Sequence, residues 1–327
     1  MKILVVRFSS IGDIVLTTPV LRALKTQLPS VEVHYLTKRA FASVIGSNPN
    51  VDRLHTIDKS IDEIIPALRE EQFDWIIDLH NNIRTKALKS KLKRPYKAFP
   101  KLNLQKWLLV KFKIDKMPDV HVVDRYFEAV KHLGVENDKQ PCEFPVNEHE
   151  AVDVYSAFAL QPKSYVCIVL GAKFKTKQLP QEKVVELVDQ LSDPIVFIGG
   201  PEDKALGEEI MAKTAHNKTY NACGAFSLQG SASIVAQSKK VLTNDTGMMH
   251  IASAFDVPIV SIWGNTVPSL GMYPYRPANV HSFTMHEVKG LGCRPCSKIG
   301  YEKCPKGHFK CMMEQDMKAI ITDLTRE

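Results

Sequence analysis

The sequence predicts two α/β domains that face each other across a cleft, each a doubly wound parallel sheet with helices on both faces. Three observations predict this fold class. Short apolar runs rich in β-branched residues alternate with amphipathic helical patterns, as in parallel sheets. The alternation occurs twice, on either side of the polar, proline-containing segment 135–150. Several expected strands end in loops rich in glycine and polar residues, where such sheets bind ligands.

The hydrophobic periodicity places the elements in order along the chain. In the first half, strands are expected at 3–6, 31–36, 53–57 and 73–79, with helices at 13–27, 60–71, 82–92 and 120–133. In the second half, strands are expected at 165–170, 194–198, 240–243 and 257–262, with helices at 181–192, 202–215, 227–237, 246–255 and 313–325. The corresponding domains are 1–155 and 156–327.

Length and composition restrict the class of protein. The chain has 327 residues, of which 44% are hydrophobic and 24% charged, which is typical of globular domains. Its apolar runs are too short to span a membrane. Arg7, Gly12 and Asp13 interrupt the N-terminal run too early for a signal peptide. We therefore expect a cytoplasmic protein with reduced cysteines.

Positive charge is concentrated in one segment. Residues 84–116 contain twelve Lys or Arg and a single acid, Asp115, in a chain whose net charge is +7. Within it, LNLQKWLLVKFK (102–113) interleaves apolar residues with lysines. Such a helix suits an anionic membrane surface or a polyanionic ligand, and it also suits packing on a core with a solvated lysine face. A nucleic-acid partner is not expected, because no recognition motif accompanies the charge.

Loops in the second half have the chemistry of a diphosphate site. LTNDTGMMHIASAF (242–255) passes from a strand into a helix at Asp245-Thr246-Gly247, where backbone N–H groups can bind an anion. LGAKFKTKQLP (170–180) adds three lysines beside a helix start, and the loops GGPED (199–203) and CGAFSLQG (223–230) follow other strands. The P-loop and GxGxxG patterns are absent. An N-cap with a packed histidine behind it remains the alternative for 242–255.

Six segments, in this order, resemble glycosyltransferase family 9, the lipopolysaccharide heptosyltransferases. They are RFSSIGDIVLTTPVLRAL (7–24), IIDLHNNIRT (76–85), GAKFKTKQLP, GGPED, NDTGMMHIASA and the closing CRPC…CPKGHFKCM. The resemblance covers nearly the whole chain. It implies the two-domain GT-B fold, with the acceptor in the N-terminal domain and the donor in the C-terminal one. The reaction it implies is heptose transfer from ADP-heptose to the inner core, built of Kdo and heptose.

The resemblance also implies roles for individual residues. Asp13 is expected to be the general base, and Lys177 to stabilise the leaving diphosphate, so that no metal or other cofactor is required. A plain helix N-cap is the alternative for Asp13. Donor contacts are expected from Ser9, Ser10, Gly12, Ala172, Lys173, Glu202, Phe226, Asp245, Thr246, Gly247 and His250. Acceptor contacts are expected from Asn81, Asn82 and Arg84. Leu179 stands where the family often has tryptophan, so packing of the donor sugar there is not carried over.

Four of the seven cysteines have spacing close to that of a zinc site: Cys293, Cys296, Cys304 and Cys311, with His308 nearby. A structural zinc ion and a buried thiol cluster both fit this pattern. Two alternatives for function also stay open. One is a GT-B transferase with another nucleotide-sugar donor or another glycan acceptor, and the other is a non-catalytic protein that binds polyanions or lipids. The expected location of the enzyme is the cytoplasm, peripherally on the inner face of the inner membrane.

Overall fold

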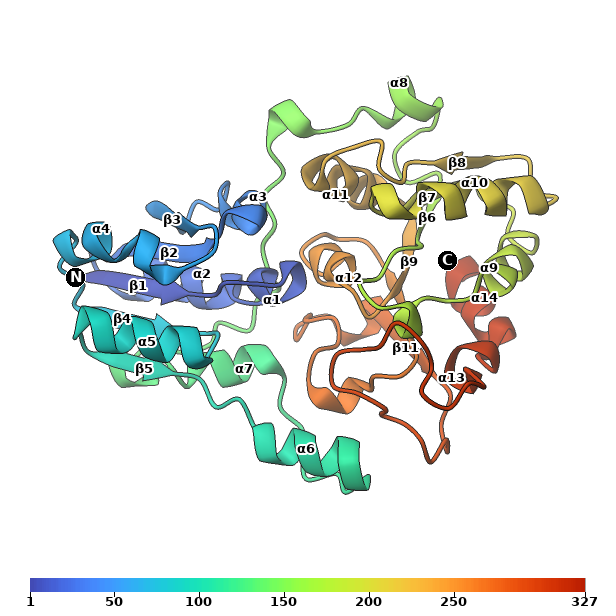
Figure 1. Cartoon of the computed structure of the whole chain (residues 1–327). Coiled ribbons are helices and arrows are strands. Elements are labelled where there is room, and N and C mark those ends of the chain that lie inside the picture. Colours follow the sequence, from blue (N-terminus) through green and yellow to red (C-terminus); the bar gives the residue numbers. More distant parts are fainter. Residues whose placement is uncertain (327) are drawn as a thin grey trace. The chain divides into compact units, whose positions relative to one another are not determined.

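The computed structural model describes residues 1–326, which form two compact units. The first unit comprises 1–102, 120–145 and 275–278, and the second comprises 103–119, 146–274 and, among the described residues, 279–326. The chain therefore crosses between them more than once, whereas the sequence suggested a single boundary after residue 155. Each unit is built around its own parallel sheet (Figure 1).

The first unit has a five-stranded sheet in the order β3-β2-β1-β4-β5, with every neighbouring pair parallel. This is the strand order of a dinucleotide-binding fold without its sixth strand. The strands are β1 (Lys2–Val6), β2 (Glu32–Lys38), β3 (Arg53–Ile57), β4 (Trp75–Asp78) and β5 (Tyr96–Ala98). The helices are α1 (Ile11–Val15), α2 (Thr18–Gln27), α3 (Ala42–Ile45), α4 (Ile65–Glu70), α5 (Ile83–Leu92) and α7 (Val122–Phe127).

The second unit has a six-stranded parallel sheet in the order β11-β10-β9-β6-β7-β8, the complete doubly wound arrangement. The strands are β6 (Val166–Val169), β7 (Ile195–Ile198), β8 (Thr219–Asn221), β9 (Lys240–Asn244), β10 (Ile259–Trp263) and β11 (Phe283–Glu287). The helices are α6 (Asn103–Phe112), α8 (Val154–Phe158), α9 (Gln181–Val188), α10 (Lys204–Lys213), α11 (Leu228–Gln237), α12 (Gly247–Ala252), α13 (Lys310–Met313) and α14 (Met317–Thr325).

Alternate residues of the central strands serve the two faces of the second sheet. Ile168 and Leu242 pack in one apolar cluster with residues of α9, α10 and α14. Cys167 and Val241, one position earlier, pack in another cluster with residues of α8, α11 and α12. Burial on both faces explains why these strands read as continuous apolar runs in the sequence. The two-domain α/β prediction is therefore confirmed.

One predicted helix, 13–27, is two helices in the structure. Proline at position 19 has no N–H and its ring would clash with the carbonyl four residues earlier, so a helix cannot continue through it. The Thr17 and Thr18 hydroxyls instead donate to the carbonyls of Ile14 at 2.6 Å and Val15 at 2.8 Å. The prediction of one continuous helix was wrong here, and the break leaves α1 as a short turn carrying Asp13.

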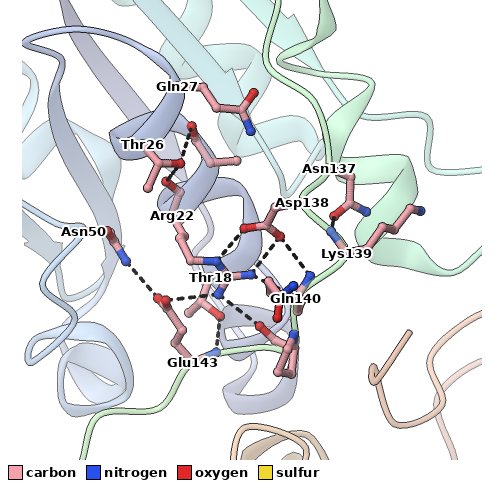
Figure 2. Close-up of polar contacts among 12 residues, drawn as sticks. Thr18, Arg22, Thr26, Gln27, Asn50, Asn137, Asp138, Lys139, Gln140 and Glu143 are labelled. Atoms are coloured by element: carbon pink, nitrogen blue, oxygen red, sulfur yellow. Dashed lines mark hydrogen bonds and ion pairs between the residues drawn. The ribbon is translucent and has the colours of Figure 1, made fainter. Parts of the chain in front are cut away.

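Arg22 of α2 anchors the chain just before the boundary at residue 145 (Figure 2). Its guanidinium binds the two carboxylate oxygens of Asp138 at 2.7 and 3.0 Å and reaches Glu143 at 3.0 Å. It also donates to the carbonyl of Pro141 at 3.0 Å. This fork of contacts holds an otherwise irregular segment against the first unit.

We expect Arg22→Ala to lower the free energy of unfolding by about 2 kcal/mol, because charge-assisted hydrogen bonds that are partly screened from water are lost. Urea denaturation followed by circular dichroism measures this effect. Arg39→Ala is the matched control, since Arg39 pairs with Asp58 at 2.9 Å but both side chains are more than half exposed. Equal destabilisation by the two variants would contradict an anchoring role for Arg22.

Candidate active site

Each sheet has a point where the strand order reverses, between β1 and β4 in the first unit and between β6 and β9 in the second. Doubly wound sheets bind ligands outside the carboxyl ends of the strands at such points. Asp13 follows β1 and Arg84 follows β4. Lys177 follows β6 and Asp245 follows β9. Each unit therefore has a candidate site where its topology favours one.

The site of the first unit is built around an ion pair between Arg7 and Asp13. Arg7 Nη2 lies 2.6 Å from Asp13 Oδ1, and the Ser10 hydroxyl donates to Asp13 Oδ2 at 2.8 Å. The buried guanidinium also donates to the carbonyls of Ser9 at 2.7 Å and Leu79 at 2.6 Å. The side chain of Asp13 nevertheless remains 22% exposed. The carboxylate is thus fixed by neighbours and still open to a substrate.

Arg7 determines the charge state of this pair. Burial disfavours its cation, but attraction to Asp13 and neighbouring groups more than offsets burial and leaves the pKa of Arg7 above its ordinary value. Protonating Asp13 would deprive a buried cation of its counter-ion, so the pair favours the ionised carboxylate. The N-terminus of α1 also favours the ionised form of a carboxylate. Because α1 has five residues, the full charge of Arg7 at contact distance is the stronger influence.

Asp78 shapes the loop that follows β4. Its Oδ1 accepts hydrogen bonds from the backbone N–H groups of His80 at 2.8 Å and Asn81 at 2.7 Å, and the Tyr96 hydroxyl donates to Oδ2. Lys101 Nζ donates to the carbonyls of His80 and Asn81 at 3.0 and 3.2 Å. These contacts fix the entry to α5 as a rigid loop.

An open pocket of about 390 Å³ lies against this loop, and it is lined by Ser9, Lys38, His80, Asn82, Ile83 and Arg84. Burial, together with the nearby charges of Arg7 and Lys101, lowers the pKa of His80 to about 3. Its imidazole is therefore neutral at physiological pH and a poor proton acceptor. Lys38 and Arg84 provide the positive charge of the lining. A pocket of this kind suits an acidic ligand.

The two asparagines expected to contact the acceptor have structural partners. Asn81 Nδ2 donates to the carbonyl of Phe99 at 3.0 Å. Asn82 Oδ1 caps α5 by accepting from the N–H of Thr85 at 3.0 Å. Asn82 also lines the pocket beside Arg84, which is exposed. Of the three residues expected to contact the acceptor, Asn82 and Arg84 therefore line the pocket and Asn81 does not.

The site of the second unit is an ion pair between Lys177 and Asp245. Lys177 Nζ lies 2.5 Å from Asp245 Oδ2 and 3.1 Å from the backbone oxygen of the same residue. The Thr266 hydroxyl donates to Asp245 Oδ2 at 2.7 Å. Both charged side chains are largely buried, with 15% and 11% exposed. Three segments distant in sequence thus meet at one carboxylate.

Arg294 holds the loop that carries Thr266. It donates to the carbonyls of Gly264 at 2.5 Å and Thr266 at 2.9 Å, and it pairs with Glu287 at 2.9 Å. A side chain at Gly264 would lie 2.8 Å from the carbonyl of Thr176, so this position has no room for a Cβ atom. The loop is therefore packed tightly beside the segment that ends in Lys177.

The expected phosphate loop has the predicted strand-to-helix form. Thr246 is the N-cap of α12 and Gly247 its first residue. The helix has six residues, shorter than the predicted 246–255. His250 is buried within it. Thr243 and Thr246 bring their hydroxyl oxygens within 3.4 Å, which adds polar atoms beside the Lys177–Asp245 pair.

The other residues expected at the donor site occupy varied surroundings. The carbonyl of Ala172 accepts a hydrogen bond from Gln178 at 2.9 Å, while Lys173 and Glu202 are exposed. The ring of Phe226 is partly buried and packs edge-on against Phe158, with 6.0 Å between centroids. Phe226 thus has a role in the packing of this unit, and its contact with adenine stays a prediction.

The four cysteines of the C-terminal loop lie near one another without surrounding a common point. Cys293 Sγ lies 3.9 Å from His308 Nε2, and Cys296 Sγ donates to the carbonyl of Cys293 at 3.0 Å. Burial raises the pKa of the Cys311 thiol to about 12. Within residues 1–326, these sulfurs do not form a group with all ligand atoms inside 4.8 Å. The structural zinc ion and the buried thiol cluster therefore both stay predictions.

Helix α6 confirms the helix expected at 102–113 and leaves large apolar side chains in solvent. Leu104 is 64% exposed, Trp107 53%, Phe112 52% and Ile114 47%. We call these four residues, with the exposed lysines Lys111, Lys113 and Lys116, the α6 surface. Residues 1–326 contain no helix with the length and hydrophobicity needed to cross a bilayer.

Several residues of the two sites were not expected from the sequence. Arg7 directly follows the apolar run 3–6 in the sequence. A cation next to a buried strand needs a counter-ion, and this signal could have indicated its pairing with Asp13. Thr266 lies in WGNTVPS (263–269), which directly follows the strand expected at 257–262, and Arg294 lies in CRPC. Lys38 ends β2 beside the pocket and had no distinguishing local signal.

Comparison with known proteins identifies a matching family and similar chains. The family model "Glycosyltransferase family 9 (heptosyltransferase)" matches residues 61–299. Lipopolysaccharide heptosyltransferase 1 of Escherichia coli K12 is 23% identical over 83% of this chain and 90% of its own length. Lipopolysaccharide heptosyltransferase 2 of Salmonella typhimurium LT2 is 26% identical over 82% and 84%.

Solved structures share the fold. A family 9 glycosyltransferase from Veillonella parvula has a TM-score of 0.75, 24% identity, and coverage of 96% of this chain and 97% of that one. E. coli heptosyltransferase WaaC with ADP-2-deoxy-2-fluoro heptose has a TM-score of 0.67, 20% identity and coverage of 91% and 96%. The iron-containing dodecameric heptosyltransferase TibC, in complex with ADP-D-β-D-heptose, has a TM-score of 0.58 at 13% identity, covering 99% and 75%.

The family model covers more than two thirds of the chain and includes the loop after β4, Lys177 and Asp245. Both relatives extend the similarity over most of the sequence. The fold, with a Rossmann-like sheet in each unit, is that of the GT-B structures it resembles. The chain belongs to glycosyltransferase family 9, the heptosyltransferase family, and is a glycosyltransferase.

Proposed function

We propose that this enzyme transfers a heptose from ADP-heptose to the inner core of lipopolysaccharide by an inverting displacement that needs no metal ion. The observation that carries the proposal is the Asp13 carboxylate, fixed by Arg7 and Ser10 and still partly exposed. Relatives that match most of the chain are lipopolysaccharide heptosyltransferases, and similar structures hold ADP-heptose or its fluorinated analogue. The first unit binds the acceptor and the second binds the donor.

Asp13 acts as the general base. As the acceptor hydroxyl oxygen attacks the anomeric carbon of the heptose, its proton passes to the carboxylate, and the bond between that carbon and the β-phosphate oxygen breaks. A sugar hydroxyl is a weak nucleophile until this proton is removed. His80 is a poor alternative base, because its pKa is lowered to about 3.

Lys177 stabilises the charge that develops on the departing ADP. Asp245 and Thr266 hold its surroundings in a fixed, largely buried arrangement, where a cation acts more strongly than in water. The N–H groups beginning α12 lie in the adjacent segment and support the same anion. A lysine and backbone donors can replace the divalent cation that other glycosyltransferases use.

The acceptor is an acidic glycan attached to a lipid. Lys38 and Arg84 line the pocket beside the Asp13 loop, and cations there suit the carboxylates and phosphates of a Kdo-containing inner core. The α6 surface combines exposed aromatic and aliphatic side chains with lysines, the composition of segments that lie on anionic membranes. We therefore propose that the enzyme works at the cytosolic, anionic face of the membrane that holds its acceptor.

The function is tested by incubating the purified enzyme with ADP-heptose and a Kdo-bearing lipid A acceptor. ADP release and the mass of the glycolipid product are measured together. We expect one heptose to be added per acceptor, with UDP-sugars inactive as donors. Turnover with a UDP-sugar, or with a neutral glycan only, would point to another GT-B activity, and no turnover at all to a binding protein.

Lys177→Ala is expected to weaken donor binding and to lower kcat, since the cation contacts the diphosphate before and during its departure. Loss of one such contact in a buried site costs ~10²–10³ in kcat. Treating the wild-type enzyme with EDTA should leave its rate unchanged. Lys218→Ala is the matched control, because it removes an exposed lysine of the same unit that belongs to neither candidate site. Strict dependence of the rate on magnesium would overturn the metal-free mechanism. Strict dependence on iron, the metal that TibC contains, would overturn it equally.

A further inference from the structure

The first unit contains a histidine cluster that the transferase chemistry does not use. His34 of β2, His55 of β3 and Glu71 after α4 place their ring nitrogens and carboxylate oxygen within 4.8 Å of one another. Within residues 1–326, no other group of three His, Cys, Asp or Glu side chains comes this close. His34 lies in the first half of β2 and His55 at the middle of β3, whereas Arg7 and Asp13 follow the carboxyl end of β1.

The hydrogen bonds of the cluster determine where its protons lie. His34 Nε2 is 2.6 Å from Glu32 Oε1, and a carboxylate can only accept, so the ring carries its proton on Nε2. His34 Nδ1 is 2.8 Å from His55 Nε2, so one proton, carried by either ring, lies between the two nitrogens. This proton links the buried lone pairs of His34 Nδ1 and His55 Nε2. A metal ion bound by both nitrogens would replace it.

Packing fixes both rings. His34 is completely buried and His55 is 8% exposed. Phe73 contacts both rings edge-on, with centroids 5.1 Å from His34 and 6.4 Å from His55. Two imidazoles already held at contact distance lose little further freedom when they bind an ion, which favours binding.

Glu71 supplies a charged oxygen. Lys2 Nζ lies 2.7 Å from Glu71 Oε2, and Arg53 binds Oε1. Lys2 is also 3.6 Å from Glu32. The two negative charges of Glu32 and Glu71 equal the two positive charges of Lys2 and Arg53, so the net charge around the cluster is zero. A bound cation would therefore add uncompensated positive charge. The site should therefore bind its ion less tightly than a thiolate site, and imidazole ligands select zinc, cobalt or nickel over magnesium.

We propose that His34 Nδ1, His55 Nε2 and a carboxylate oxygen of Glu71 bind one divalent ion of the zinc type, with Glu32 orienting His34 from behind. A carboxylate behind a metal-binding histidine is the usual outer-shell arrangement. Tetrahedral ligands at about 2.0–2.1 Å are about 3.3 Å apart, so the two rings need to separate by only about half an ångström. His55 then holds its proton on Nδ1. The ion would join β2, β3 and the end of α4 and take no part in transfer.

Cobalt(II) tests this proposal, because its spectrum reports the ligands. The full-length chain, treated with chelator and dialysed, is titrated with Co²⁺ alone. We expect one visible ligand-field spectrum without the near-ultraviolet charge-transfer band of thiolates. His55→Gln should weaken binding about tenfold or more, and Glu32→Gln by about 10- to 100-fold through its effect on His34. His281→Gln, which changes an exposed histidine elsewhere, should bind as the wild type does.

A second measurement guards against misfolding of the variants. Zn²⁺ should raise the Tm of the wild type and of His281→Gln but not that of His55→Gln or Glu71→Gln, each compared with its own metal-free sample. A thiolate band that persists in His55→Gln would place the metal at Cys293 and its neighbours and overturn the proposal. Absence of any cobalt spectrum would mean that the cluster is a hydrogen-bond network only.

Discussion

Replacing Asp13 with asparagine is expected to lower kcat by ~10²–10⁴-fold while the affinity for ADP-heptose stays close to that of the wild type. Asparagine keeps the shape of the side chain but cannot accept the proton of the acceptor hydroxyl. The base acts on the acceptor, so donor binding should be spared. Single-turnover rates and calorimetric titration with ADP separate the two quantities.

The ion pair with Arg7 makes a control necessary, because the asparagine variant leaves a buried guanidinium without its counter-ion. Thermal unfolding shows whether the variant is folded at the assay temperature. Asp58→Asn is the matched control: it removes an exposed carboxylate that pairs with Arg39 at 2.9 Å and follows the edge strand β3, which β2 separates from β1. A variant at position 13 that keeps more than about a tenth of the wild-type rate would exclude Asp13 as the base.

The fold could be predicted largely from hydrophobic patterning, and the failures have physical reasons. The central strands are mostly apolar because helices cover both faces, and every strand that was expected lies within two residues of its expected bounds at each end. The strands β5, β8 and β11 were missed. They lie at sheet edges, and the first two have three residues each, so few of their side chains are buried. A short, half-exposed strand has no periodicity to detect.

The candidate sites were predictable only in part, because the sequence shows residues and not their partners. Asp13 and Lys177 stood out through local motifs and the family resemblance. The partner of Lys177, however, is Asp245, 68 residues further along the chain. From the sequence, Lys177 was expected to stabilise the leaving diphosphate and Asp245 to contact the donor, with no contact expected between the two. Their direct pairing follows from the strand order, which places β6 beside β9, and no local pattern contains that information.

Replacing Lys111 and Lys116 with glutamine is expected to reduce binding to anionic phospholipid vesicles by about thirtyfold at low salt. Each cation near such a surface contributes about 1 kcal/mol, and 1.4 kcal/mol corresponds to tenfold. Lys111 and Lys116 are exposed, so folding should be unaffected. Vesicle sedimentation with purified protein measures the partition coefficient. Lys101 does not belong in this test, because it holds the carbonyls of His80 and Asn81.

Three controls distinguish docking on a membrane from a helix that merely has charged edges. Lys204→Gln with Lys218→Gln removes the same charge from exposed positions elsewhere in the second unit and should leave binding almost unchanged. Trp107→Ala should weaken binding to vesicles even in high salt, since salt screens the lysines but not the burial of an aromatic ring. Activity on a short, soluble acceptor should survive in all variants, while activity on the lipid-linked acceptor falls with vesicle binding. Equal loss in both pairs of lysine variants would mean that net charge alone, and not the α6 surface, attracts the enzyme to the bilayer.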